Sequence, residues 1–305
     1  IVLRVYPITP GEASKIKEGA LLVGFMSQHK NLDSVRILRD RKVSTIAMEL
    51  IPRISRAQSM DALSSQASIA GYQAVLMAAT YLDKYFPLLM TAAGTIQPAK
   101  IVIMGAGVAG LQAIATAKRL GAVVEVSDIR PAVKEQVESL GGRFIDFSMD
   151  ESGEGEGGYA RELTPEQLAA QQKVVREKVV AADAVITTAL VPGRPAPKLI
   201  TADMVEEMRE GAVIVDLAVE QGGNCELSKS GEMVVANGVT IIGHPNMPAA
   251  TPADASLLYA RNIQTLLLSL LKEGALVLDL EDEIVDGALL THDGEVRHKP
   301  TAEAL

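Results

Sequence analysis

Short apolar runs alternate with amphipathic stretches along most of this chain, and the clearest example spans residues 100–128. An apolar run at residues 100–104 leads into the glycine-rich stretch GAGVAG, and a second apolar run covers residues 122–126. Between them, apolar side chains recur at helical spacing from Val108 onward, and Gly121 follows as a stop signal. Short β-branched runs are typical of buried strands, and a 3.6-residue period is typical of a helix. The pattern predicts a strand, a turn, a helix and a second strand, in that order.

The same alternation extends over the rest of the chain. Apolar runs predict further strands at residues 1–6, 20–25, 43–50, 143–147, 182–190, 212–218, 239–244, 276–280 and 284–298. Helical spacing predicts helices at residues 32–41, 60–84, 131–140, 165–180, 202–210 and 253–273. Strands that alternate with helices are typical of an α/β fold with parallel sheets.

We therefore expect an α/β protein built from two Rossmann-like open parallel-sheet domains with a nucleotide cleft between them. Residues 1–63 and 253–305 are expected to form an N-terminal-type (catalytic) domain whose N-terminal part is missing. Residues 64–252 are expected to form the dinucleotide-binding Rossmann domain.

The turn after residues 100–104 carries Gly105, Gly107 and Gly110 in the spacing G-x-G-x-x-G. In a dinucleotide-binding unit the first glycine permits the tight turn, the second lets backbone approach a pyrophosphate, and the third allows close packing. The N-terminus of the following helix offers N–H groups to the phosphates. Asp128 follows about 20 residues after the motif, where an acid that binds the adenosine ribose is expected. A carboxylate there favours NAD over NADP, although an arginine such as the nearby Arg130 accommodates a 2′-phosphate in NADP-binding proteins.

A strand–helix–strand unit that binds nothing is the alternative interpretation of this motif. A lone G-x-G-x-x-G is weak evidence, but here it follows a predicted strand, opens a predicted helix and precedes an acid at the expected distance. This context favours dinucleotide binding.

Composition and charge restrict the class of protein. The chain has 305 residues, of which 48% are hydrophobic and 22% charged, as is usual for a soluble globular protein of about two domains. The net charge of −9 argues against a nucleic-acid-binding surface. The single cysteine, Cys225, excludes an internal disulfide and fits a reducing compartment. No apolar stretch approaches the ~20 residues of a membrane span, and no secretory signal is recognisable.

Residues 52–65, PRISRAQSMDALSS, link a predicted strand to a long helix for which Ser59 is the expected N-cap. Asp61 and Ser64 are three residues apart, on one face of the predicted first turn. The same stretch carries further polar side chains, namely Arg53, Arg56 and Gln58. Two interpretations stay open: a capped helix start with solvated charges, or a loop that binds a ligand.

Three later segments carry candidate ligand contacts. Residues 150–160, DESGEGEGGYA, form either a surface linker or a mobile flap with Tyr159 as its one aromatic side chain. The predicted strand 182–190 runs into a stiff PGRPAP loop at its carboxyl end, where open α/β sheets bind ligands. His244 lies at another strand end and is either a structural histidine or a titratable group of a site.

Several segments together resemble the alanine dehydrogenase/transhydrogenase family, and within it the NAD(H)-binding part of proton-translocating transhydrogenase. They are PRISRAQSMDALSS (52–65), GAGVAGLQAIATAKRLGA (105–122), DIR (128–130), VKEQVESLGG (133–142), TTALVPGRPAPKLIT (187–201) and VDLAVEQGGNCELS (215–228). The resemblance covers nearly the whole chain. Its most specific segment is the first, because that loop separates transhydrogenases from alanine dehydrogenases.

The resemblance implies an NAD(H) site from which hydride passes directly to NADP(H) on a partner domain, while a membrane domain couples the transfer to proton movement. It implies that no acid, base or metal takes part in the hydride step, because the protein supplies proximity and orientation. The implied partners are the NADP(H)-binding β subunit and the membrane domain. The implied location is peripheral, at the cytoplasmic face of the inner membrane, with the chain itself soluble and homodimeric.

The resemblance also assigns roles to single residues, in three sets. The residues expected to orient the nicotinamide and the hydride transfer are Arg53, Gln58, Asp61 and Ser64. Among these, Gln58 is expected to reach toward the partner's nucleotide. The residues expected at the pyrophosphate are Gly105, Ala106, Gly107, Val108 and Gly110. The residues expected around the adenosine ribose and along the path to the nicotinamide are Asp128, Ile129, Arg130, Ala189 and Leu190, and those expected in a loop closing over NAD are Gly157, Gly158 and Tyr159.

Two departures from the family keep other functions open. Relative to the family, the chain lacks on the order of seventy N-terminal residues, roughly half a domain. Residues 244–252, HPNMPAATP, resemble alanine dehydrogenase, but that enzyme needs a catalytic histidine near residues 24–29, where Ser27 stands, and an aspartate where Glu220 stands. We therefore favour a transhydrogenase component, with NAD-dependent alanine dehydrogenase second and a non-catalytic NAD sensor third.

Overall fold

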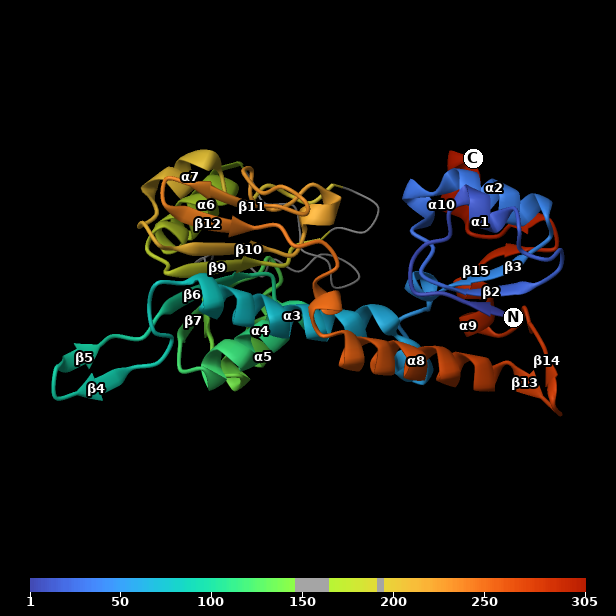
Figure 1. Cartoon of the computed structure of the whole chain (residues 1–305), viewed down its shortest axis with the longest axis horizontal. Coiled ribbons are helices and arrows are strands. Elements are labelled where there is room, and N and C mark those ends of the chain that lie inside the picture. Colours follow the sequence, from blue (N-terminus) through green and yellow to red (C-terminus); the bar gives the residue numbers. More distant parts are fainter. Residues whose placement is uncertain (146–164, 191–194) are drawn as a thin grey trace. The chain divides into compact units, whose positions relative to one another are not determined.

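The computed structural model of the chain describes residues 1–145, 165–190 and 195–305. Proximity of Cα atoms divides the chain into two compact units: unit 1 comprises residues 1–66 and 252–305, and unit 2 comprises residues 67–251. In Figure 1 the blue segments, together with the dark orange helix α8 (Pro252–Ser269) and the red segments that follow it, form unit 1, and the segments from cyan to light orange form unit 2. The two ends of the chain therefore build one unit, and the middle of the chain builds the other.

Seven strands form one sheet in the described part of unit 2. They are β6 (Lys100–Met104), β7 (Val123–Ser127), β8 (Arg143–Phe144), β9 (Ala184–Thr187), β10 (Val213–Asp216), β11 (Met233–Ala236) and β12 (Val239–Ile242). Their order across the sheet is β11-β12-β10-β9-β6-β7-β8, and only the β11–β12 pair among these is antiparallel. Counted from β6 and without β11, this is the 3-2-1-4-5-6 order of dinucleotide-binding sheets, with the switch point between β6 and β9.

Helices cover both faces of this sheet, since its strands are apolar on both sides. One face packs against α4 (Val108–Arg119), α5 (Lys134–Ser139) and part of α3 (Ala62–Tyr81), and the other against α6 (Pro165–Val180) and α7 (Ala202–Glu207). On β6, Ile101 and Ile103 belong to the first core, while Val102 and Met104 belong to the second. The predicted α/β fold with a Rossmann-type parallel sheet is confirmed.

Unit 1 has a mixed sheet of five strands among its described residues. They are β1 (Val2–Leu3), β2 (Leu21–Gly24), β3 (Ser44–Ala47), β15 (Leu289–His292) and β16 (Glu295–Val296), in that order across the sheet. The first three strands are parallel, but β15 is antiparallel to β3, and β16 is antiparallel to β15. The open parallel sheet predicted here is therefore extended by an antiparallel hairpin.

Two cores lie on the two faces of the unit 1 sheet. The helices of this unit are α1 (Pro10–Ala13), α2 (Leu32–Asp40), α8 (Pro252–Ser269), α9 (Glu283–Ala288) and α10 (Lys299–Ala304). Apolar side chains of α1 and α2 pack on one face, and those of α8 and α9 pack on the other. A small hairpin, β13 (Leu271–Lys272) with β14 (Ala275–Leu276), follows α8.

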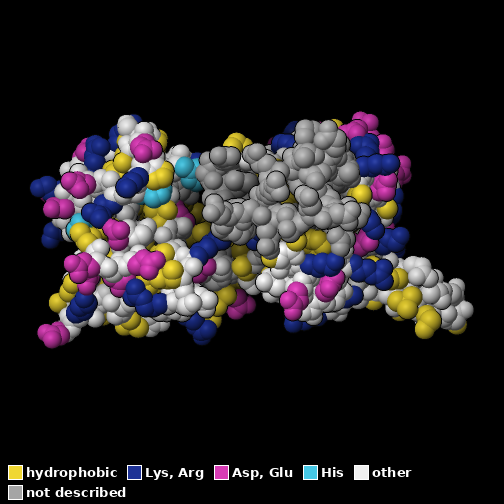
Figure 2. Space-filling model, turned by 180° about the vertical axis from the view of Figure 1, so that it is seen from behind, with side chains coloured by type: hydrophobic (Ala, Val, Ile, Leu, Met, Phe, Trp, Pro, Cys, Tyr) yellow, Lys and Arg dark blue, Asp and Glu magenta, His cyan; other side chains and the backbone are white. Residues whose placement is uncertain are grey.

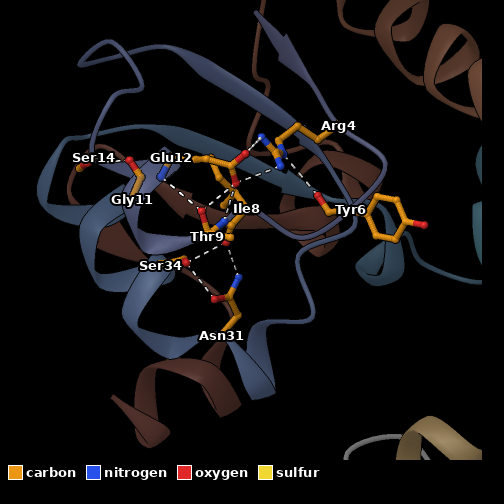
Figure 3. A network of polar contacts seen from close by, with 9 residues as sticks. All are labelled: Arg4, Tyr6, Ile8, Thr9, Gly11, Glu12, Ser14, Asn31 and Ser34. Atoms are coloured by element: carbon orange, nitrogen blue, oxygen red, sulfur yellow. Dashed lines mark hydrogen bonds and ion pairs between the residues drawn. The ribbon is translucent and has the colours of Figure 1, made fainter. Parts of the chain in front are cut away.

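A polar network ties the start of α1 to the strand before it and to α2 (Figure 3). Thr9 and Glu12 form a capping box, and the Arg4 guanidinium donates to both Glu12 carboxylate oxygens at 3.0 Å. The Thr9 main-chain N–H and hydroxyl, together with Arg4, lower the pKa of Glu12 to about 2. On the other side, Asn31 and Ser34 donate to the Ile8 carbonyl oxygen at 2.7 and 2.8 Å. The segment between β1 and α1 is thereby fixed without regular secondary structure.

The long helix α3 does not begin where the sequence predicts, and Ser59 is not its N-cap. Residues before it form a 3-10 helix, η3 (Ser55–Met60), and α3 starts at Ala62. The Asp61 carboxylate accepts from Ser64 N at 2.9 Å, as an N-cap side chain does. The capping residue was therefore misidentified among several candidates of the same type.

Other predicted elements also differ from the structure. Residues 284–288, predicted as strand, lie in the helix α9, whose start is capped by Asp282 through a 2.8 Å bond from Ile284 N. The predicted connection 91–98 contains most of a hairpin formed by β4 (Leu89–Thr91) and β5 (Gly94–Ile96), and β11 was not predicted. The predicted helix 253–273 ends earlier, at the close of α8.

The described surface visible in Figure 2 intersperses Lys and Arg with Asp and Glu side chains. The yellow-and-white projection at the lower right is the β4–β5 hairpin, where Leu88, Met90 and Ile96 are exposed. Among the described residues, no helix is both long enough and apolar enough to cross a membrane.

Candidate functional site

The glycine-rich turn of unit 2 lies directly after β6, at the switch point of the sheet. Gly105 has φ +106°, which L side chains rarely adopt, and a Cβ there would lie 2.4 Å from Thr188 Oγ1. The Thr188 hydroxyl lies 3.2 Å from the Met104 carbonyl oxygen and 3.1 Å from that of Gly105, and can donate to either. A Cβ at Gly110 would lie 1.8 Å from the Gly105 carbonyl oxygen. Both glycines are therefore needed for the turn to pack against α4 and the end of β9.

The N-terminus of α4 is open toward this turn. Its N-cap is Gly107, and no side chain hydrogen-bonds at the cap. The N–H groups of a first helical turn have no partner within the helix, and the helix dipole makes this end positive. A Cβ placed on Gly107 would meet no atom within 4 Å, so backbone here can approach a ligand closely. This arrangement fits a pyrophosphate, and Val108, 43% exposed, is the first residue of the helix beside it.

Asp128 follows β7 and is buried, with four donors on its carboxylate. Ala106 N donates to Oδ2 at 2.7 Å, and Arg130 N donates to Oδ1 at 2.8 Å. The Arg130 guanidinium adds two bonds of 3.1 Å, one to each oxygen. Burial alone would raise the pKa of Asp128, but Arg130 and the two main-chain N–H groups outweigh it and hold the pKa below its usual range. The carboxylate is therefore ionised at neutral pH.

These four donors have a consequence for the ribose-binding role expected of Asp128. An ionised carboxylate offers about four lone-pair sites, and all four are in use. A ribose hydroxyl therefore binds Asp128 only where one present donor withdraws. The Arg130 side chain is 42% exposed, whereas that of Asp128 is 6% exposed, so the guanidinium is the donor with room to move. The sequence shows that Asp128 and Arg130 are two residues apart, but the ion pair between their side chains is seen only in the structure.

Ala189 and Leu190 follow β9 on the other side of the switch point. Leu190 is 47% exposed, and Ile129, after Asp128, is 65% exposed. Exposed apolar side chains at the carboxyl edge of such a sheet suit the flat face of a nucleotide base. The structure thus gathers Gly105, Asp128 and the Ala189–Leu190 segment at one edge of unit 2.

Asn224 holds this edge in place, and sequence reasoning missed it. Its side chain is fully buried, accepts from Ala189 N at 3.1 Å, and donates to Ala189 O at 2.9 Å and to Pro197 O at 2.8 Å. All three bonds of the amide are therefore made to the loop after β9. The signal available in the sequence was the Gly-Gly-Asn run at residues 222–224, shortly after a predicted strand.

Asp216, at the end of β10, hydrogen-bonds the residues that follow Asn224 and so fixes the position of that segment. Its carboxylate is fully buried and accepts from Thr187 Oγ1, Ala218 N, Cys225 N and Ser228 Oγ at 2.6 to 3.1 Å. A buried carboxyl group with this many hydrogen bonds is a fixed point of the structure. Cys225, which is buried beside it, has its pKa raised to about 11 by burial, which makes it unreactive as a thiolate.

The four residues expected at the nicotinamide lie in unit 1, around η3 and the start of α3. Asp61 and Ser64 bond one another: the Asp61 carboxylate accepts from Ser64 N at 2.9 Å and from Ser64 Oγ at 2.5 Å. These two residues therefore serve at least as a helix cap, which is one of the two interpretations of this loop. Arg56 is not free either, because its guanidinium makes a bidentate pair with Asp282 at 2.7 and 2.9 Å.

Arg53 and Gln58 differ from the rest of this loop. Both side chains are exposed, and neither makes a hydrogen bond or ion pair with a residue that the structure describes. A guanidinium and an amide that are held on an otherwise anchored loop, and that have no partner in the described part of the chain, are available to a ligand. The helix-cap interpretation therefore accounts for Asp61 and Ser64 but not for Arg53 and Gln58.

The loop after β2 bears on the alternative enzyme. Ser27 stands near the position at which alanine dehydrogenase needs its histidine, and it adopts the left-handed conformation with φ +47°. The Glu49 carboxylate accepts from Met26 N at 2.9 Å and from Ser27 N at 2.6 Å, and burial raises the pKa of Glu49. His29 lies in the following 3-10 turn and is exposed. At this position the chain therefore carries the hydroxyl of Ser27, and an imidazole follows only two residues later, at His29.

Some expected site residues cannot be placed. Gly157, Gly158 and Tyr159, and the whole predicted flap 150–160, lie outside the described residues.

Glu220 accepts from Asn246 N at 3.2 Å, so the carboxylate that stands where alanine dehydrogenase needs an aspartate is hydrogen-bonded to the loop HPNMP, residues 244–248. In the same loop, His244 Nδ1 is buried and has no hydrogen-bond partner among the described residues.

The sheet order, the G-x-G-x-x-G turn at the switch point and the acid after the second strand define a dinucleotide-binding α/β protein. The chain belongs to the alanine dehydrogenase/PNT family. Residues 1–70 match the family described as alanine dehydrogenase/PNT, N-terminal domain, and residues 74–299 match the corresponding C-terminal domain.

Within this family the similarity is greater to transhydrogenases. The chain is 52% identical to the first part of NAD(P) transhydrogenase subunit alpha of Rhodospirillum rubrum over 291 residues, which are 94% of this chain and 76% of that protein. The crystal structure of transhydrogenase from Sinorhizobium meliloti has a TM-score of 0.85 and 48% identity, covering 97% of this chain and 79% of that one. A structure of L-alanine dehydrogenase has a TM-score of 0.79 and 26% identity, covering 99% and 80%. The resemblance found in the sequence is confirmed.

Proposed function

We propose that this chain is the NAD(H)-binding component of a proton-translocating transhydrogenase, and that hydride passes directly from its NADH to NADP⁺ held by a partner domain. The observation that carries the proposal is the loop of residues 52–65. It presents Arg53 and Gln58 without partners among the described residues, and it contains no histidine or lysine. An ordinary dehydrogenase needs a proton acceptor beside the nicotinamide, whereas transfer between two nicotinamides needs none.

Two sets of residues divide the work in this proposal. In unit 2, the glycine turn and the open end of α4 bind the pyrophosphate, and Asp128 binds the adenosine ribose once Arg130 withdraws. In unit 1, Arg53, Asp61 and Ser64 orient the carboxamide, and Gln58 reaches toward the partner's nucleotide. Bound NADH supplies the hydride. The protein contributes proximity and orientation, which together can lower a barrier by about 7–11 kcal/mol.

The partners in this proposal follow from the names of the related proteins. The relative in Rhodospirillum rubrum is named as one portion of a subunit alpha, which supports a multi-subunit assembly. We infer an NADP(H)-binding β subunit and a membrane domain as partners of this chain. Attachment to that membrane domain would place the chain peripherally, at the cytoplasmic face of the inner membrane.

NAD-dependent alanine dehydrogenase is the second candidate, supported by the structural similarity to L-alanine dehydrogenase. Two features of this chain disfavour it: Ser27 at the loop end where a histidine is required, and Glu220 in place of an aspartate. A third candidate is a protein that senses NAD without chemistry. Alanine-dependent reduction of NAD⁺ would support the second candidate, and NADH binding without any transfer would support the third.

The direct test mixes this chain with the NADP(H)-binding domain of a transhydrogenase and follows hydride transfer from NADH to an NADP⁺ analogue by absorbance. We expect transfer that requires both proteins and that continues when alanine and ammonia are absent. The control replaces the partner domain with an equal amount of an unrelated NADP-binding protein. Absence of transfer, with NADH binding intact, would contradict the proposal.

A further inference from the structure

Asn262 on α8 is a buried polar residue that the proposed function has not used. It is 7% exposed and lies on a helix face otherwise made of apolar side chains such as Ile263 and Leu266. Its amide nitrogen donates to Ser59 O at 2.8 Å, and its amide oxygen accepts from Ser65 Oγ at 2.8 Å. A buried amide is normally kept only where its hydrogen bonds are made, and both of these bonds go to the loop of residues 52–65.

The two partners of Asn262 lie on either side of the junction between η3 and α3. Ser59 is the residue after Gln58, near the end of the 3-10 helix, and Ser65 is in the first turn of α3. One planar group therefore fixes both sides of the junction, which contains Asp61 and Ser64. The Ser65 hydroxyl is also 3.1 Å from the Ala62 carbonyl oxygen. A slip of either segment along α8 would break a bond of Asn262.

Two further contacts, one before Gln58 and one after the junction, anchor the loop. Arg56 makes its bidentate pair with Asp282 near the beginning of η3. Beyond the junction, Gln66 Nε2 donates to Ala255 O at 3.1 Å, again on α8. The backbone around Gln58 is thus held on both sides, while the Gln58 side chain has no partner among the described residues. This is the arrangement needed to aim an amide at a ligand rather than to bury it.

We propose that Asn262 is a positioning residue for hydride transfer: it sets the main-chain position next to Gln58 and thereby the direction in which the Gln58 amide points. The inference rests on the proposed function. It predicts that Asn262 affects the rate of transfer much more than the affinity for NADH, because the pyrophosphate and ribose contacts are made by residues of unit 2. An amide is required since it combines one donor and one acceptor. A carboxylate keeps the acceptor for Ser65 but repels the Ser59 carbonyl oxygen.

The test is the Asn262→Asp variant in the complete chain, mixed with a saturating transhydrogenase NADP(H)-binding domain. Stopped-flow transfer should slow tenfold or more, while the dissociation constant for NADH, measured by titration, should stay within twofold. The matched control is Asn237→Asp, the same change at an exposed asparagine that donates to Glu206 O in unit 2. The control should leave both quantities unchanged.

A merely structural role for Asn262 would lower the melting temperature without a selective loss of transfer. If Asn262→Asp does not fold, Ser65→Ala removes one of the two bonds and should give a smaller loss of rate at unchanged NADH affinity. A double variant with Gln58→Asn should be no slower than Gln58→Asn alone, since Asn262 acts through Gln58. Additive losses would overturn the inference.

The outcomes separate this inference from the proposed function. Wild-type protein that transfers no hydride overturns the proposed function and this inference with it. Wild-type transfer, together with an Asn262→Asp variant that folds and transfers within twofold of the wild-type rate, overturns the inference alone. Equal losses of NADH affinity and transfer rate would also overturn it, because Asn262 would then act on the nucleotide site as a whole.

Discussion

At the scale of single residues, the candidate site combines groups that are held by the protein with groups that are left for a ligand. Asp128 is the clearest held group, with four donors around one carboxylate, and Gln58 is the clearest available one. The two lead to different predictions, because one should determine the affinity for the cofactor and the other the rate of transfer.

Asp128→Ala should weaken NADH binding by about 1–3 kcal/mol, the cost of removing a charged hydrogen-bond partner. Calorimetric titration measures this, and the control is Glu125→Gln on β7, the strand that Asp128 follows. Glu125 is paired with Lys178 at 2.6 Å, and its loss should leave the affinity for NADH within twofold.

The wild-type protein should bind NADH more tightly than NADPH, because Asp128 accepts from a 2′-hydroxyl and repels a 2′-phosphate. Equal affinities would contradict the assignment of Asp128.

Gln58→Asn shortens one side chain by a methylene and should slow hydride transfer by tenfold or more, about 1.4 kcal/mol or above. NADH affinity should change little, since the pyrophosphate and ribose contacts are made by other residues. Stopped-flow transfer with a saturating NADP(H)-binding partner, beside an NADH titration, measures both. A variant that loses affinity and rate in equal measure would make Gln58 a nucleotide ligand instead. A variant with neither loss would leave the loop as a helix cap only.

The predictable part of the candidate site is the part encoded by local spacing. Gly105, Gly110 and Asp128 were found because a turn, a helix start and a strand end follow one another within about 25 residues of chain. Asn224 and Asn262 were not found, because the partners of Asn224 lie 27 and 35 residues away in sequence and those of Asn262 lie 197 and 203 residues away. A buried amide that fixes a distant loop leaves no periodic or motif signal, so only the folded chain shows it.

At the scale of elements, one ion-pair network joins the segment after α3, the strands β6 and β9, and the segment after α7. Asp183 precedes β9 and is 5% exposed. It accepts from Lys84 Nζ, Lys100 N and Arg209 Nε, each at 2.8 Å. Burial alone would raise the pKa of Asp183, but Lys84, the Lys100 N–H and Arg209 outweigh it and keep the pKa below its usual value.

Asp183→Asn should lower the free energy of unfolding by about 3 kcal/mol, because it leaves cationic groups beside a buried neutral amide. The matched control is Asp83→Asn, which removes an exposed partner of the same Arg209 and should cost about 0–1 kcal/mol. Urea unfolding of the two variants and the wild type measures this. Equal costs for Asp183→Asn and Asp83→Asn would show that burial of the pair is unimportant.

The same network predicts a dependence on pH. A carboxyl whose pKa is lower in the folded than in the unfolded chain stabilises the fold fully above the unfolded value, about 4, and this contribution is lost as the pH falls through the folded value. The wild-type protein should therefore lose stability below about pH 4 more steeply than Asp183→Asn does. If the free energy of unfolding falls equally steeply below pH 4 in the two proteins, the prediction is contradicted.

The elements that the sequence predicted incorrectly have identifiable causes. The residues of α9 are apolar enough to suggest a strand. The feature that marks them as a helix is the N-cap of Asp282, and this hydrogen bond is seen only in the folded chain. The β4–β5 hairpin carries three exposed residues in β5, so it has no alternation of buried and exposed positions to reveal it. The sheet of unit 2 was predicted well because its strands are buried on both faces and alternate with helices.

At the scale of the whole molecule, exposed apolar side chains lie along two long helices: Leu63, Tyr72 and Tyr81 on α3, and Leu257 and Leu268 on α8. Apolar surface of this kind is typical of an interface between subunits. We therefore predict a homodimer. Light scattering at micromolar concentration should give twice the mass of the 32.3 kDa chain. A monomer under these conditions would contradict the prediction.

The central claim is direct hydride transfer from NADH on this chain to NADP⁺ on a partner domain, and isotope transfer tests it most directly. NADH with both hydrogens at C4 replaced by deuterium is mixed with the chain, a transhydrogenase NADP(H)-binding domain and NADP⁺ in ordinary water. Mass spectrometry of the product should show NADPH carrying one deuterium, in an amount equal to the NAD⁺ formed. NADPH that carries hydrogen from the solvent, or no NADPH although NADH is bound, would contradict direct transfer.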